Sequence, residues 1–212
     1  MNLQLTLPLS RLSRALGAFR TRYPEVNFRI VQIAPDSMME MVQMLENGEV
    51  DLCFTAAALD EDNIREIPVL HAEVFLAVPH GHRLAGRTSI TLQEVAGEAF
   101  IEYKAGHPFR KMNEEFCRLA GISRNVVCEV DEPAALASLV SAGLGAAFVP
   151  GCKGDEQPSF AMVRIEKPSC YRTFTVAWLE RRYLSKAARE FQSFLIEYFG
   201  EFQEPMKHRD VI

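Results

Sequence analysis

The chain has 212 residues, and its 23 basic and 28 acidic side chains give a formal net charge of −5. Hydrophobic residues make up 48% and charged residues 24%, a globular composition that excludes disordered, collagen-like and coiled-coil chains. No apolar run approaches the roughly 20 residues of a membrane helix, and residues 1–10 lack the pattern of a signal peptide. We therefore expect a cytoplasmic protein without membrane contacts, and the acidic balance argues against a phosphate-binding nucleic-acid surface on this chain.

The first half of the chain alternates between helical and extended patterns. Apolar residues at helical spacing predict helices over about residues 8–22 and 37–47, the second closed by Asn47-Gly48. Alternating or continuous apolar residues predict strands at about 3–7, 26–33 and 50–54. This order is typical of a mostly parallel sheet with helices on its faces.

The second half restarts the same alternation. Thr91 and Glu94 form a capping box before a short helix, and Pro108 and Pro133 open two longer helices. A last helix runs from Ser185 to Gly200. Strands are predicted at about residues 74–79, 100–103, 126–130, 145–150, 160–165 and 172–179. The fold class is therefore α/β, with two Rossmann-like lobes joined by crossing strands and a cleft between them.

A positively charged turn is the strongest candidate for a binding site. Residues 103–110 join a strand to a helix N-terminus, where unpaired backbone N–H groups and the helix dipole favour an anion. Lys104, His107 and Arg110 add positive charge. The alternative is that His107 only caps the helix and the three cations are solvated. Other strand-to-helix junctions carry Ser10, Thr55 and Asp131-Glu132-Pro133, each of which by itself is more often a cap.

Motifs for catalysis or cofactor binding are missing. Gly143-Leu144-Gly145 leads into a strand, and Phe148 stands where a dinucleotide fingerprint needs a small residue. His80-Gly81-His82 has no acidic metal-binding partner nearby and is better interpreted as a turn. We expect no enzyme activity, no metal and no cofactor, although an enzyme of this fold class acting on a small carboxylate is a rival interpretation.

The five cysteines are odd in number and include no C-x-x-C pair, so no disulfide framework is expected. Cys53 and Cys128 lie in apolar runs, where free cysteine behaves as a small hydrophobe. Cys152 follows Pro150-Gly151 in a predicted loop, and it is the one thiol expected to be exposed enough for redox chemistry, although Lys153 is the only neighbour that would lower its pKa.

Three segments in order carry a family resemblance: FRTRYPEV at residues 19–26, LENGEVDL at 45–52 and LVSAGLGAAFVP at 139–150. Together they resemble the effector-binding domain of LysR-type transcriptional regulators, over nearly the whole chain. The resemblance implies a fold similar to type 2 periplasmic binding proteins, with lobe I at 1–78 and 173–212 and lobe II at 79–172. The helix-turn-helix domain that precedes this domain in the family is absent here, so any contact with DNA would be made through that missing domain.

The resemblance also implies a small effector, a carboxylate by preference, in the inter-lobe cleft. The residues assigned to it are Ser10, Thr55, Tyr103, Lys104, Gly106, His107, Glu132 and Phe148. A rival from another class is a solute-binding protein that feeds a transporter, against which the missing signal peptide argues.

Self-association is the last expectation. The resemblance implies an antiparallel homodimer in which the first helix and its following strand meet residues 112–119 and 126–130 of the partner, and a tetramer of the full-length protein is left open. The assigned interface residues are Leu12, Ala15, Phe19, Phe116, Val126 and Cys128. The alternative is that these apolar side chains belong to the core.

Overall fold

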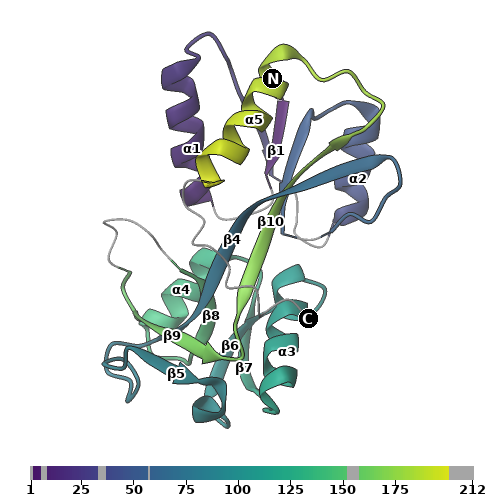
Figure 1. Ribbon diagram of the computed structural model, residues 1–212. Helices are drawn as coiled ribbons and strands as arrows, with labels where there is room; N and C mark the ends of the chain where they lie inside the picture. Colours follow the sequence, from purple (N-terminus) through teal and green to yellow (C-terminus); the bar gives the residue numbers. More distant parts are fainter. Residues whose placement is uncertain (1, 6–8, 33–36, 57, 152–157, 201–212) are drawn as a thin grey trace. The chain divides into compact units, whose positions relative to one another are not determined.

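The computed structural model describes residues 2–5, 9–32, 37–56, 58–151 and 158–200 (Figure 1). The chain divides into two compact units, unit 1 with Met1–His71 and Thr173–Ile212, and unit 2 with Ala72–Arg172. Strands β4 (Ile64–Val78) and β10 (Tyr171–Leu179) each have residues in both units. The first unit boundary lies inside β4 at His71, and the lobe boundary at residue 78 that the resemblance implies stays a prediction.

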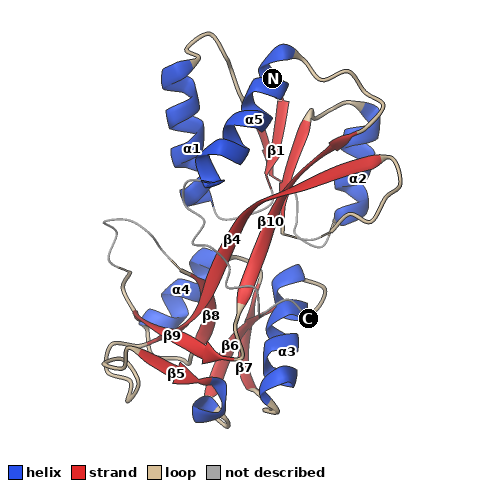
Figure 2. Ribbon diagram, in the orientation of Figure 1, coloured by secondary structure: helices blue, strands red, loops and turns tan. Residues whose placement is uncertain are grey.

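Unit 1 contains a sheet whose strands β2, β1 and β3 are parallel, with β10 antiparallel beside β3. A helix in each connection allows neighbouring strands to run parallel, because the chain must return before it pairs again. The elements of this unit are β1 (Asn2–Leu5), α1 (Leu9–Arg22), β2 (Arg29–Gln32), α2 (Met38–Asn47), β3 (Leu52–Thr55) and α5 (Lys186–Gly200) (Figure 2).

Unit 2 contains two groups of strands. In the first, β4 pairs antiparallel with β8 and β9, and β9 pairs parallel with β5. In the second, β6 and β7 form a parallel two-stranded sheet. The elements are β5 (Ser89–Thr91), the 3-10 helix η1 (Leu92–Val95), β6 (Ala99–Tyr103), α3 (Pro108–Ala120), β7 (Asn125–Val130), α4 (Pro133–Ser141), β8 (Ala147–Pro150) and β9 (Ala161–Lys167). The predicted α/β fold class is confirmed.

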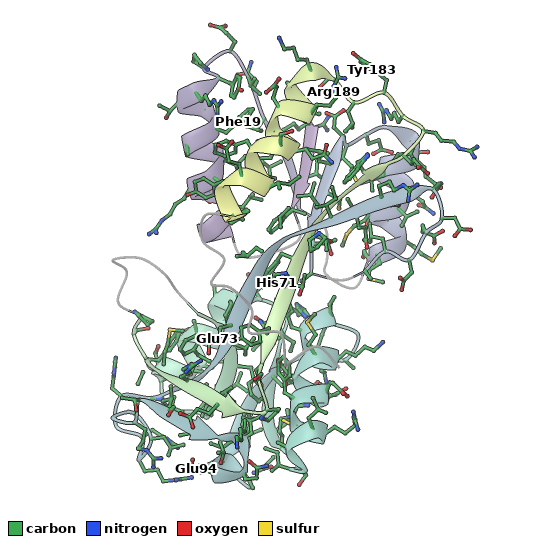
Figure 3. The ribbon with its side chains drawn as sticks, viewed as in Figure 1. Phe19, His71, Glu73, Glu94, Tyr183 and Arg189 are labelled. Carbon is green, nitrogen blue, oxygen red and sulfur yellow. The ribbon has the colours of Figure 1, made fainter. Side chains whose placement is uncertain are left out.

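The core of unit 1 is rich in aromatic rings. Phe19 of α1 (Figure 3) is fully buried. Its ring lies 4.9 Å from that of Phe191 and 5.2 Å from that of Phe194, both on α5. Edge-to-face rings at these distances add to the burial of the side chains, which is worth about 1.5–3 kcal/mol for each phenylalanine. This packing holds the first and last helices of the described chain together.

Local signals placed the helix ends well. The capping box is present, because the Glu94 carboxylate accepts the Thr91 N–H at 2.9 Å. Helix α2 ends at Gly48 with φ 73°, and α3 ends at Gly121 with φ 68°. Side chains with a Cβ rarely adopt this left-handed conformation, so glycine ends both helices.

Strand β4 is much longer than the predicted segment of residues 74–79. It begins at Ile64 and includes Pro68, which has no N–H to donate. Burial along its first half is irregular, and charged residues interrupt the apolar pattern there. Periodicity therefore detected only the buried end, whereas the pairing of β4 with β10 defines the rest.

Candidate functional site

Two aromatic rings, one at each end of the turn between β6 and α3, stack on each other. Tyr103 ends β6 and His107 precedes α3, and both side chains are buried, with 2% and 3% exposure. Their ring centroids are 4.1 Å apart, and the Phe109 ring lies 5.2 Å from that of His107. His107 Nδ1 accepts the Phe109 N–H at 3.1 Å. The cap that the sequence left as an alternative is thus present, and Nδ1 carries no proton when it accepts this hydrogen bond.

Most N–H groups at the start of α3 are already used. The His107 N–H donates to the Lys104 carbonyl at 3.2 Å, and the Arg110 N–H donates to the His107 carbonyl at 3.0 Å. Pro108 has no N–H. In the described part of the chain, the N–H groups of Ala105 and Gly106 carry no hydrogen bond. Ala105 and Gly106, whose N–H groups are available to an anion, lie in the exposed turn that precedes the helix.

The cations of this turn have carboxylate partners. Lys104 Nζ lies 2.7 Å from Asp131 Oδ1 at an exposed position. The Arg110 guanidinium pairs with Glu114 at 3.0 Å and with Glu129. The hydrogen bonds to these carboxylates raise the pKa of Arg110. The turn is consequently less positive than its sequence suggests, although an exposed pair such as that of Lys104 exchanges partners at little cost.

A buried polar network lies behind the turn. Glu102 of β6 is 1% exposed and accepts the Tyr103 N–H and Asn113 Nδ2, both at 2.8 Å. Its carboxylate also pairs with Arg124. Asn113 Oδ1 in turn accepts Nη2 of Arg172 at 2.9 Å. This network ties β6, α3 and the start of β10 together.

Sequence reasoning missed this network, although one signal was available. Asn113 lies on the buried face of α3 between Phe109 and Phe116, at helical spacing. A polar residue on an apolar face needs a buried partner, because an unsatisfied amide is costly there. Nothing in the local sequence identifies Arg172 as that partner.

The unit 1 candidates occupy the ends of two elements. Thr55 ends β3 with 2% exposure, and its carbonyl accepts the Thr175 hydroxyl at 3.4 Å. Ser10 is the second residue of α1, and its side chain lies outside the described part of the structure. A ligand that lies between the two lobes stays a prediction.

The remaining candidates of unit 2 differ in their surroundings. Glu132 precedes α4 at an exposed position, and its side chain makes no capping hydrogen bond. Phe148 of β8 is 1% exposed, stacks on Phe100 at 5.5 Å and belongs to the hydrophobic core. The ring of Phe148 thus packs in the core of unit 2, and a contact of this residue with the effector stays a prediction.

The predicted interface residues fall into two groups. Leu12, Ala15 and Phe19 are at most 1% exposed inside unit 1, and Phe116 is 8% exposed in the core of unit 2. For these four side chains the core alternative holds. Val126 and Cys128 are partly exposed on β7, an edge strand of its sheet.

Chemistry at cysteines and histidines is limited in the described residues. Burial raises the pKa of Cys53, Cys117 and Cys170 to about 12, so these thiols stay protonated near neutral pH. Cys152 lies outside the described residues. His82 is in a turn, where its N–H donates to the Pro79 carbonyl at 2.9 Å. Across the described ranges there is no group of three metal-ligating side chains, and none of the helices there is long and apolar enough to span a bilayer.

Comparisons with known proteins identify the family to which this fold belongs. The family model "LysR substrate binding domain" matches residues 3–200. The uncharacterized HTH-type transcriptional regulator YybE of Bacillus subtilis is 35% identical over 92% of this chain and 66% of its own length. The transcriptional dual regulator GltC of the same organism is 27% identical over 91% of this chain. The chain spans 64–66% of the length of these two relatives.

Solved structures agree with this placement. The effector-binding domain of QuiR in complex with shikimate has a TM-score of 0.82 at 22% identity, covering 95% of this chain and 97% of that one. The regulatory domain of CcmR from Synechocystis in complex with 2-PG has a TM-score of 0.80 at 19% identity, covering 94% and 96%. At such identities the likeness establishes the fold.

Proposed function

This chain belongs to the LysR substrate-binding domain family, and from that premise we propose that it senses a small anionic effector for a longer DNA-binding regulator. Its fold is that of type 2 periplasmic binding proteins, and it is an effector-binding domain of the LysR type. The DNA-binding part is proposed to lie in the remaining third of a full-length protein, because the chain spans about two thirds of its relatives.

The exposed turn before α3 is the observation that supports an anionic ligand. Ala105 and Gly106 present two N–H groups without partners in the described part of the chain. Gly106 has φ 91°, a conformation that glycine readily adopts at the third position of a tight turn. A carboxylate oxygen bound there forms charge-assisted hydrogen bonds, which are roughly twice as strong as neutral ones. Lys104 beside them adds a cation that can leave its exposed partner Asp131.

Two structural neighbours are named with a bound small molecule, shikimate and 2-PG. Their names support a small-molecule effector for this chain as well. The same comparisons favour a regulator over the rivals, because the relatives that match are transcriptional regulators and the transporter alternative has no support.

A thermal-shift screen of the chain against small metabolites tests this function. A ligand that binds only the folded state raises the unfolding midpoint by mass action. We expect hits among small carboxylates, with matched neutral amides of the same acids inactive. Hits confined to cations or neutral amides would contradict the proposed ligand class.

We propose a homodimer as the assembled form. Three exposed apolar side chains support it: Ile30 on the edge strand β2, Val127 on the edge strand β7 and Leu119 on α3, with 44%, 47% and 54% exposure. These positions replace the buried residues that the sequence suggested. A two-fold contact uses the same two surfaces from each chain, so one apolar substitution removes two contacts.

A further inference from the structure

Arg172 is an unusual side chain in unit 2. It is 0% exposed and is among the largest fully buried side chains of the chain. Its guanidinium carbon lies 3.9 Å from the centroid of the Phe109 ring, and Nη2 donates to Asn113 Oδ1 at 2.9 Å. Nε and Nη1 are buried and have no hydrogen-bond partner in the described part of the chain. Two of its three nitrogens therefore lack an acceptor.

The charges around Arg172 do not balance. Glu102 is the buried carboxylate of the network, and it already pairs with Arg124. Arg172 contacts the neutral amide of Asn113 and the face of an aromatic ring. Burial lowers the pKa of Arg172 to about 10, so the guanidinium still carries its charge near neutral pH. Arg124 pairs with Glu102 and also lies 3.7 Å from the carboxylate of Glu114. Arg172 forms no ion pair with a carboxylate of the described residues.

A buried charge without a counter-charge is strongly unfavourable, and charged groups inside proteins are normally paired. A trapped water molecule can accept an N–H, but it does not neutralise the charge. The Phe109 ring attracts the cation and likewise provides no negative charge. An anion satisfies both requirements, because it accepts hydrogen bonds and pairs with the guanidinium.

We propose that Arg172 is the receptor of a small-anion site inside unit 2, which takes a monovalent anion the size of a halide or a formate. A small anion is proposed because the guanidinium is fully buried and its contacts Phe109 and Asn113 are each 1% exposed. This site is separate from the exposed donors of Ala105 and Gly106. The inference therefore holds whether or not that turn binds the effector.

The site is tested by thermal unfolding in sodium salts of equal ionic strength. Bromide and formate are compared with gluconate, an anion too large to enter a packed interior. We expect a saturable rise of the wild-type midpoint in bromide and formate relative to gluconate, because the anion binds only the folded state. Arg172→Met removes the charge and should abolish that rise.

Arg164→Met is the matched control, since Arg164 is an exposed arginine of the same unit that pairs with Glu73 at 2.7 Å. It should keep the full response to bromide and formate. Equal midpoints for wild type in all three salts would overturn the proposal, as would a response that Arg172→Met retains.

Crystals of the wild-type chain soaked in bromide give a readout that needs no variant to fold. An anomalous peak within hydrogen-bond distance of Nε or Nη1 of Arg172 is the expected result. Water at those nitrogens in bromide-soaked crystals would overturn the site even if the midpoints shifted.

Discussion

The imidazole of His107 lies nearly parallel to the phenol ring of Tyr103, with centroids 4.1 Å apart and planes inclined by 15°. Tyr103 is the last residue of β6 and His107 precedes α3, so the stack fixes both ends of the intervening turn. Ala105 and Gly106 are exposed between these ends. The donors proposed for the effector are thus held by buried rings on either side.

The stack and the cap make His107 important for stability. His107→Ala should lower the free energy of unfolding by about 1–3 kcal/mol, because the Phe109 N–H and the Tyr103 ring lose their partner. His107→Asn should recover part of this loss, since asparagine is a strong N-cap. Urea unfolding measures both, with His80→Ala at an exposed position as the control. Equal stabilities for the two alanine variants would contradict this role.

Gly106 should matter for binding as well as for stability. Gly106→Ala and Gly97→Ala both place a Cβ at positive φ, 91° and 83°, so each should cost about 1–2 kcal/mol of folding free energy. Only Gly106→Ala should also weaken the effector found by screening, because it distorts the donor turn. Calorimetry separates the two effects. Equal dissociation constants for both variants would place the effector away from this turn.

Thr55 and Ser10 are proposed contacts of the effector in unit 1. Thr55→Val keeps the shape and removes the hydroxyl, which should weaken binding by about 1–3 kcal/mol if an anion oxygen loses its donor. Ser10→Ala should act in the same direction. Calorimetry with the screened ligand measures both, and an unchanged dissociation constant for both variants would exclude these contacts.

Val127 tests the proposed homodimer. Val127→Lys places a charge on an exposed apolar position of the edge strand β7 and should shift the chain to monomer. Leu144→Lys is the control, since Leu144 has a similar exposure of 45% outside the proposed surfaces. Analytical ultracentrifugation reads out both variants. A wild-type chain that stays monomeric at high concentration would refute the dimer for this domain.

Glu102 should be required for the fold of unit 2. Glu102→Gln leaves Arg124 without its buried carboxylate, and breaking such a pair costs about 3–5 kcal/mol. The control is Glu98→Gln, which breaks the partly exposed pair with Arg83 and should cost at most about 1 kcal/mol. Urea unfolding compares them. Similar losses for both variants would mean that the buried network adds no special stability.

Local sequence determined the features that neighbouring residues control. Apolar spacing identified the helices, and Gly48 and the Thr91–Glu94 pair identified two of their ends, because caps and left-handed residues act within one turn. The three resembling segments indicated the family, which the family model confirms. The sequence offered a cap as the alternative role of His107, and the structure shows that cap.

Only the tertiary structure decided which partners these residues meet. Apolar spacing shows that Leu12 and Phe19 are buried but not whether the covering surface is α5 of the same chain or a second copy. Arg172 and Asn113 are 59 residues apart in sequence, and a hydrogen bond across that distance leaves no local pattern. Counting charges in the sequence likewise overestimated the positive charge of the turn before α3. Glu129, which pairs with Arg110, lies on β7, the strand beside β6. Contacts between distant segments depend on the packing of whole elements, and that packing also buries the unpaired charge of Arg172.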